Sequence, residues 1–476
     1  MKKAAYVLLV VFIIAEIIFS FVQHYHISLD GDLANIVLPD PGYQKVLDDP
    51  FGVNVFLNDA VYPATNRYFA HWFQLSYFRN MPLFLQHFTD PINSIYLSCS
   101  IAKTGIQFMM IFLLAFFITG SRGVFKRDFL LASALITPLF QTFGYNGYMG
   151  IIDHSITYSF FYALASLLLL LFFLPFFIQG FHQKEKKLNV WSLIGLLILT
   201  FILPFHGPLN SAVILIVCPM IFLIKWWSNY KKLPEEKLVR RAVIALKDMP
   251  LQLSVFFVLA SVLSLYSLYI GRNNSENFWV EVSLLERYSR LPMGLYYQLT
   301  QKLGLPLLLG LIIINTSIIW KGNIHKQKLV GLLKWIILFS VIYLLLLPLG
   351  GYREYRPNII RRDTIMPIIL AMISFFGISS FYILRHIRLR KNFYYAGIIV
   401  FEIIFIAADA KIQDHNSCER KALYDLASSS EKEVVLEDDC NVMSWGNFKD
   451  FQSSKNNTSL LLYWGVINEE KLYRHK

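Results

Sequence analysis

Apolar residues gather in long runs that recur along the whole sequence. The runs 163–177 and 336–347, for example, contain no charged residue. A helix needs about 20 apolar residues to cross a bilayer, whereas a helix of a soluble protein keeps one polar face. The pattern therefore predicts an all-α polytopic membrane protein.

The hydropathy pattern predicts about eleven transmembrane helices. We expect them at 4–22, 95–119, 128–143, 155–180, 190–206, 209–227, 251–270, 304–320, 332–349, 364–384 and 393–409. The first run follows two lysines as in a signal peptide, but no small-residue cleavage site follows it. We therefore expect it to be retained as the first span.

Positive charge is concentrated in alternate connections between the expected spans. These basic connections are 121–127, 182–187, 225–247, 321–328 and 385–391. Lysine and arginine are retained on cytoplasmic loops, so the N-terminus is expected in the cytoplasm. With an odd number of spans, the C-terminus is expected on the exterior or periplasmic side of the plasma (inner) membrane.

The spans divide the chain into residues 1–410, a transmembrane domain, and residues 411–476, a small exterior C-terminal domain. The domain 1–410 includes a long exterior loop, 23–94, in which we expect surface helices. One of them, 66–78, carries an aromatic stripe that would lie on the membrane or pack on the protein. Strand-like runs at 433–437 and 459–464 predict an α+β or β-rich C-terminal unit, with acceptor recognition or lid packing as its role.

Composition agrees with lipid as the solvent, because 55% of the 476 residues are hydrophobic and only 16% are charged. The formal net charge of +12 is explained by the basic loops, so no nucleic-acid partner is expected. The sequence has no glycine-rich phosphate loop of the Walker or dinucleotide kind. Among the four cysteines, Cys99 and Cys218 fall in spans, whereas Cys418 and Cys440 in the tail are candidates for a disulfide.

The long exterior loop opens with two acidic residues around a glycine, Asp30-Gly31-Asp32. The glycine permits a tight turn that would aim both carboxylates at one point, where they would act as general base, metal ligand or electrostatic anchor. An Asx-type turn that ends the first helix is the simpler alternative. With His24 and His26 nearby, a divalent cation held by these four residues stays open, and no cofactor is assigned.

Other polar residues fall on the same expected side. Asp153 and His154 precede a span, where Asp153 could instead cap the helix, and His206 lies in a tight turn. All three are candidates for lining a substrate cavity.

The exterior loop 350–363 breaks the charge rule, because it holds four arginines: Arg353, Arg356, Arg361 and Arg362. Guanidinium groups bind phosphate with two hydrogen bonds and stay charged. They would hold a lipid phosphate or pair with the acidic residues of the loop and its headgroup surroundings. Tyr352 and Tyr355 in this loop are further cavity candidates.

An acidic pair in a long first exterior loop, surface helices in that loop and arginines in a late exterior loop together resemble the GT-C superfamily of membrane glycosyltransferases. The resemblance implies that Asp30 or Asp32 activates the acceptor hydroxyl and that Arg353, Arg356, Arg361 and Arg362 hold the donor phosphate. It also implies a polyprenyl-phosphate-linked sugar as donor, a lipid or glycan acceptor, and membrane lipids as partners. The glycine between the acids and the small tail depart from the family pattern.

Two kinds of protein compete with this interpretation. A polysaccharide polymerase would share the reaction class but would place its basic loops between central spans. A lipid or oligosaccharide flippase or secondary transporter would show internal repeats and polar residues at the membrane midplane, whereas the polar residues here gather at one face. A membrane scaffold without catalysis is a third alternative.

Overall fold

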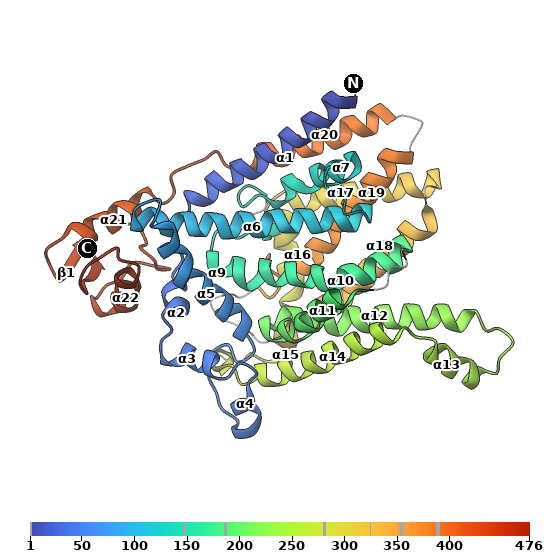
Figure 1. The fold of residues 1–476 in the computed structure, drawn as a ribbon, viewed down its shortest axis with the longest axis horizontal. Helices are drawn as coiled ribbons and strands as arrows, with labels where there is room; N and C mark the ends of the chain where they lie inside the picture. The colour runs from blue at the N-terminus through green and yellow to red at the C-terminus, as the bar shows by residue number, and fades with distance from the viewer. Residues whose placement is uncertain are drawn as a thin grey trace.

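The computed structural model describes residues 2–145, 149–184, 188–278, 282–323, 325–350, 352, 356, 358–386 and 391–476. In this part the chain is mostly helical, with one small sheet of two strands (Figure 1). The predictions made for Arg353 and Tyr355 fall on residues outside the described ranges.

Nine helical segments among the described residues are long and apolar enough to cross a membrane. They are α1 (Lys2–Tyr25), α6 (Pro91–Thr119), the continuous run of α9 (Ile156–Tyr158), η2 (Ser159–Leu164) and α10 (Ala165–His182), α12 (Pro208–Lys231), α14 (Leu251–Gly271), α17 (Gly304–Gly322), α18 (Lys326–Leu346) with η5 (Leu347–Gly350), α19 (Met366–His386) and α20 (Lys391–Ala408). The chain is a multi-pass helical membrane protein, and its described residues hold nine such helices where the sequence predicts about eleven spans.

The two remaining predicted spans form shorter helices that end at prolines. They are α7 (Arg127–Ile136), which passes into the 3-10 helix η1 (Thr137–Phe140), and α11 (Val190–Ile202), which is followed by the 3-10 helix η3 (Pro204–His206). Proline has no backbone N–H to donate, so it cannot continue the hydrogen-bond ladder of an α-helix. Pro138 and Pro204 therefore interrupt the two apolar runs before either helix reaches full length.

The centre of the bundle is formed by α6 and α19. The most apolar windows of both helices are 72% buried, whereas that of α1 is only 6% buried. Large apolar side chains of α1, such as Leu8 and Ile18, are exposed on its surface. In a membrane protein this outer apolar surface is the face that contacts lipid.

The connections sort to the two ends of the bundle. We call the end at which α1 finishes and α6 begins the loop end. At the opposite end, described residues near three of the basic connections lie together, since Arg385 pairs with Asp128 at 3.1 Å and Lys184 binds the carbonyl of Gly120.

At the loop end the first long loop forms four helices: α2 (Leu33–Val37), α3 (Pro41–Asp48), α4 (Val53–Asn58) and α5 (Tyr68–Leu85). The helix expected at 66–78 is realised as α5, which begins later and runs further. Just before α5, the hydroxyl of Thr65 donates to the carbonyl of Ile270 at 2.8 Å. Phe73 packs against the ring of His206 at 5.7 Å, so part of the aromatic stripe packs on the protein.

The remaining helices are α13 (Leu238–Lys247), η4 (Ser275–Phe278), α15 (Leu284–Ser289) and α16 (Leu291–Thr300).

The C-terminal unit is a small α+β structure that packs on the first loop (Figure 1). It contains α21 (Ser417–Ser428), β1 (Glu433–Leu436), η6 (Gln452–Ser454), α22 (Lys455–Tyr463) and β2 (Leu472–His475), and the two strands pair in parallel. The predicted strand 459–464 is wrong, because these residues mostly belong to α22. Leu460, Leu461 and Trp464 are all buried at helical spacing, and the indole of Trp464 donates to the carbonyl of Phe78 at 2.9 Å.

Candidate functional site

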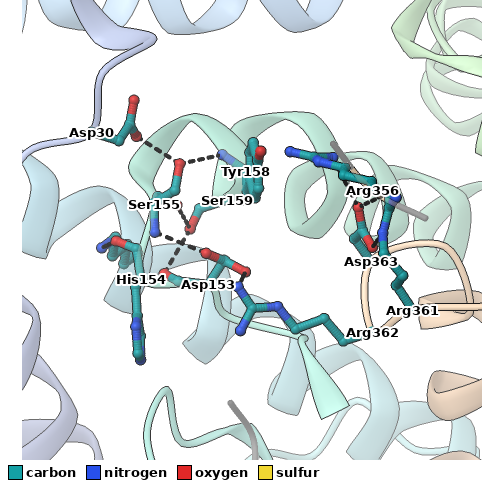
Figure 2. Close-up of polar contacts among 11 residues, drawn as sticks. Asp30, Asp153, His154, Ser155, Tyr158, Ser159, Arg356, Arg361, Arg362 and Asp363 are labelled. Carbon is teal, nitrogen blue, oxygen red and sulfur yellow. Dashed lines mark hydrogen bonds and ion pairs between the residues drawn. The ribbon is translucent and has the colours of Figure 1, made fainter. Parts of the chain in front are cut away.

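Polar side chains from three loops converge at the loop end, around the start of α9 (Figure 2). One loop follows α1 and carries the Asp30-Gly31-Asp32 turn. The second precedes α9 and carries Asp153, and the third precedes α19 and carries the described arginines. The span beyond α9 begins with the π-helical segment η2, a distortion that is frequent at functional sites.

Asp30 is a buried anchor for the turn. Its carboxylate is only 4% exposed. It accepts hydrogen bonds from the hydroxyl of Ser155 at 2.7 Å, from the backbone N–H and hydroxyl of Thr157, both at 2.9 Å, and from the N–H of Asp32 at 3.0 Å. A carboxylate offers about four lone-pair sites, so these four donors occupy the group. Asp30 therefore fixes the first loop to the start of α9.

Asp32 has a different environment. It is half-buried, and its Oδ1 accepts a hydrogen bond from the indole N–H of Trp445 at 3.0 Å. Burial and the adjacent charge of Asp30 raise the pKa of Asp32 to about 6, against the opposing effects of Trp445 and Arg356. A carboxylate with this pKa is ionised at neutral pH but takes a proton more readily than an exposed aspartate, which suits a general base.

Gly31 allows the C-terminal unit to approach the acidic turn. A Cβ at this position would lie 2.6 Å from the backbone nitrogen of Trp445 and 2.7 Å from its ring carbon Cδ1. No side chain fits there without displacing that backbone. The glycine between the two acids is thus explained by a contact with the tail.

The described arginines form a cluster with buried carboxylates (Figure 2). Arg361 binds Asp363 through two hydrogen bonds of 3.0 and 2.9 Å, and Arg362 pairs with Asp153 at 2.8 Å. Burial opposes ionisation of Asp363, but Arg361 holds its pKa below the usual value. Arg361 therefore stabilises the loop before α19 internally. Arg362 connects this loop to the loop before α9.

Arg356 lies between the arginine cluster and the start of α9. Its guanidinium carbon lies 5.0 Å from the centre of the Tyr158 ring, and it reaches Asp363 at 3.4 Å. Burial and the charge of Arg361 lower the pKa of Arg356, while Asp363 and Asp32 oppose this effect. Asp32 and Arg356 therefore influence each other electrostatically although they lie far apart in the sequence.

The remaining cavity candidates are held by neighbouring groups. His206 is buried with Nε2 at 3.0 Å from the carbonyl of Phe160. Tyr352 is buried under the guanidinium of Arg290, which lies 4.7 Å from the ring centre and binds the hydroxyl. His154 is exposed, and its ring centre lies 4.5 Å from that of Phe143.

The four residues suggested as metal ligands do not converge. Both ring nitrogens of His24 contact threonine hydroxyls, of Thr104 at 2.9 Å and Thr142 at 2.7 Å, and His26 contacts Asp414 at 2.9 Å. Across the residues described, no group of three or more histidine, cysteine, aspartate or glutamate side chains is arranged to hold a metal ion.

The loop that carries Trp445 is fixed from several sides. The predicted pair Cys418 and Cys440 is joined by a disulfide with Cα atoms 6.3 Å apart. Glu419 is buried and accepts from the N–H of Met443 at 2.8 Å, the N–H of Leu29 at 2.9 Å and the hydroxyl of Tyr96 at 2.8 Å. Burial raises the pKa of Glu419 to about 7.

Trp445, Tyr158 and Glu419 were missed by the sequence reasoning. Trp445 lies in an irregular segment without periodicity, and Glu419 falls on a helix whose sequence resembles an exposed one. No pattern in the sequence distinguishes these residues from solvated ones. Their importance follows from contacts between segments that are distant along the chain.

Comparison with protein families, with curated proteins and with solved structures found no match to this chain.

Proposed function

We propose that this chain is a membrane glycosyltransferase that moves a sugar from a polyprenyl-phosphate-linked donor to a hydroxyl of a lipid or glycan acceptor on the non-cytoplasmic side. The observation that carries the proposal is that Asp32 and Arg356 lie at the same end of the bundle and close enough for each charge to shift the pKa of the other. Asp32 is a half-buried carboxylate with a raised pKa, and the positive charge of Arg356 acts on it at one end of the membrane bundle. A base for a hydroxyl and a cation for a phosphate are the two groups that this transfer needs.

The reaction assigns one role to each group. The acceptor O–H gives its proton to Asp32 while the acceptor oxygen bonds to the anomeric carbon of the donor sugar. The bond from that carbon to the phosphate oxygen breaks, and the lipid phosphate leaves with the electron pair. Arg356 stabilises the negative charge on the departing phosphate, because a guanidinium binds phosphate oxygens and stays charged.

In this proposal the other predicted site residues hold the two reacting groups, Asp32 and Arg356, in place. Asp30 orients the turn that carries Asp32, through its bonds to Ser155 and Thr157. Arg361 and Arg362 fix the loop that carries Arg356, through Asp363 and Asp153. The sequence has no glycine-rich phosphate loop of the Walker or dinucleotide kind. A lipid-linked donor would instead reach the site through the membrane.

The proposal is tested by incubating the purified full-length protein in detergent with a panel of polyprenyl-phosphate sugars and measuring transfer. Asp32→Asn and Arg356→Ala are compared with Asp59→Asn, an exposed aspartate that follows α4 and lies outside the site. Transfer that is lost in Asp32→Asn, with folding retained, supports the proposal. Undiminished transfer in Asp32→Asn excludes Asp32 as the base. Binding of the lipid without donor consumption, weakened only in Arg356→Ala, would favour a transporter instead.

A further inference from the structure

Trp445 is an exposed aromatic side chain next to the candidate base. Its side chain is 58% exposed although its indole N–H is bound to Asp32. In the same unit Trp464 is fully buried. A tryptophan that is fixed at one edge and exposed on its face needs an explanation other than core packing.

The Trp445 ring lies beside the ring of Tyr158, which belongs to the membrane bundle. The centres of the Trp445 and Tyr158 rings are 6.0 Å apart, with 36° between their planes. Arg356 lies over Tyr158. The two rings thus form an aromatic wall, defined by Trp445 and Tyr158, that extends from Asp32 to Arg356.

A wall of this kind matches the chemistry of a pyranose ring. One face of such a sugar presents C–H groups, which carry a small positive charge, and aromatic faces are negative. The hydroxyls around the sugar ring need hydrogen-bond partners when water is excluded. The carboxylate of Asp32 beside the indole supplies an acceptor at the edge of the wall. A lipid chain would need no such polar group.

The segment that carries Trp445 is held by contacts on several sides. The backbone of Trp445 packs against Gly31, and Asn457 donates to the carbonyl of Met443 at 2.9 Å. The disulfide and the buried Glu419 hold the same segment. A binding surface that is already ordered loses little conformational entropy on binding.

We propose that Trp445 and Tyr158 form a carbohydrate-stacking wall that binds the pyranose ring of the acceptor and directs one of its hydroxyls to Asp32. The C-terminal unit is then a part of the active site and not an appendage. The assignment of this sugar to the acceptor rests on the proposed function, because Asp32 is the group that takes the acceptor proton. Binding of a sugar to the wall does not depend on transfer.

The test is saturation-transfer NMR on the full-length protein in detergent with methyl glycosides of common pyranoses. We compare wild type with Trp445→Ala, Trp445→Phe and Asp32→Asn. Trp191→Ala is the control, because Trp191 is 79% exposed on α11, outside the site. Saturation of the sugar ring protons is expected in wild type and Trp191→Ala, should persist in part in Trp445→Phe and Asp32→Asn, and should be lost in Trp445→Ala.

Two results would overturn the proposal: equal saturation in wild type and Trp445→Ala, or no saturation by any glycoside in wild type. An intact Cys418–Cys440 disulfide in Trp445→Ala establishes that the variant has folded. Loss of saturation in Trp445→Ala without transfer in wild type would retain the sugar site and reject the transferase. In the transfer assay, Trp445→Ala should raise the KM for the acceptor roughly tenfold and leave the KM for the donor unchanged.

Discussion

The hydroxyl of Ser155 donates a hydrogen bond of 2.7 Å to the carboxylate of Asp30, and this bond joins the first loop to the helix that begins at α9. Two residues further on, Asp32 receives a hydrogen bond from the far end of the chain. Two acids of one short motif therefore have different surroundings. One is saturated by donors of the bundle, and the other remains half-buried and open to a reactant.

This difference predicts opposite effects of the two amide substitutions. Asp30→Asn should lower the free energy of unfolding by about 1–3 kcal/mol, because the amide NH2 that replaces one carboxylate oxygen cannot accept from the donors that face it. Asp32→Asn should leave stability unchanged or raise it at pH 8, because the raised pKa of Asp32 means that its charged form is disfavoured in the fold. Only Asp32→Asn should abolish transfer while the protein stays folded.

Thermal unfolding in detergent, followed by intrinsic fluorescence, measures the stability difference. Asp59→Asn is the matched control for both variants. Equal destabilisation by Asp30→Asn and Asp32→Asn would contradict the assignment of Asp30 as the anchor.

The activity should depend on pH through Asp32. A base must be deprotonated to act, so kcat/KM should rise with pH and reach half its maximum near pH 6. The indole N–H of Trp445 lowers this pKa, so Trp445→Phe should move the midpoint to higher pH. A midpoint that is the same in both proteins would show that another group limits the rate.

The arginines should separate into two classes. Arg356→Ala should raise the KM for the lipid-linked donor roughly 10–100-fold, because a hydrogen bond to a charged group contributes about 1.5–3 kcal/mol. Arg361→Ala should instead lower the free energy of unfolding by about 1–3 kcal/mol, because buried Asp363 loses a partner that binds it twice. Donor kinetics and thermal unfolding, measured on both variants, distinguish these effects. A purely kinetic effect of Arg361→Ala would assign this residue to the phosphate as well.

Docking of the C-terminal unit should weaken as the pH rises through neutrality. The docked Glu419 has a pKa of about 7, above the usual 4.5 of a glutamate, so the docked state binds the proton more tightly. Its contribution to docking is therefore full at low pH and decreases as the pH rises through 7. Hydrogen exchange in α21 should be faster at pH 8 than at pH 6, and Glu419→Gln should reduce this difference. The exposed Glu431→Gln serves as the control, and an unchanged pH dependence in Glu419→Gln would contradict the assignment.

Much of the membrane fold could be predicted because it depends on local hydropathy. The apolar runs of α6 and α19 predict spans whatever their neighbours are. For the runs at 128–143 and 190–206 the predicted helices are too long, because apolar content does not reveal that Pro138 and Pro204 shorten the helices. The segment 459–464 was misassigned because a short apolar run is compatible with a strand or a buried helix.

The site could be predicted only in part, because its geometry depends on contacts across the whole chain. The sequence singled out the acidic pair and the arginine loop as unusual charges near the membrane. It could not show that Arg362 reaches Asp153 or that Trp445 reaches Asp32. It also could not assign separate roles to Asp30 and Asp32, since the donors that distinguish them come from α9 and from the tail.

The contact between Trp445 and the acidic turn has a consequence for biosynthesis. A ribosome translates Trp445 only after α20, the last membrane helix described above. A nascent chain with its helices already inserted still lacks the indole partner of Asp32 and the backbone that packs on Gly31. The site can therefore form only after the tail has been translated and has docked. A chain whose translation stops before Trp445 would insert its helices yet lack this part of the site.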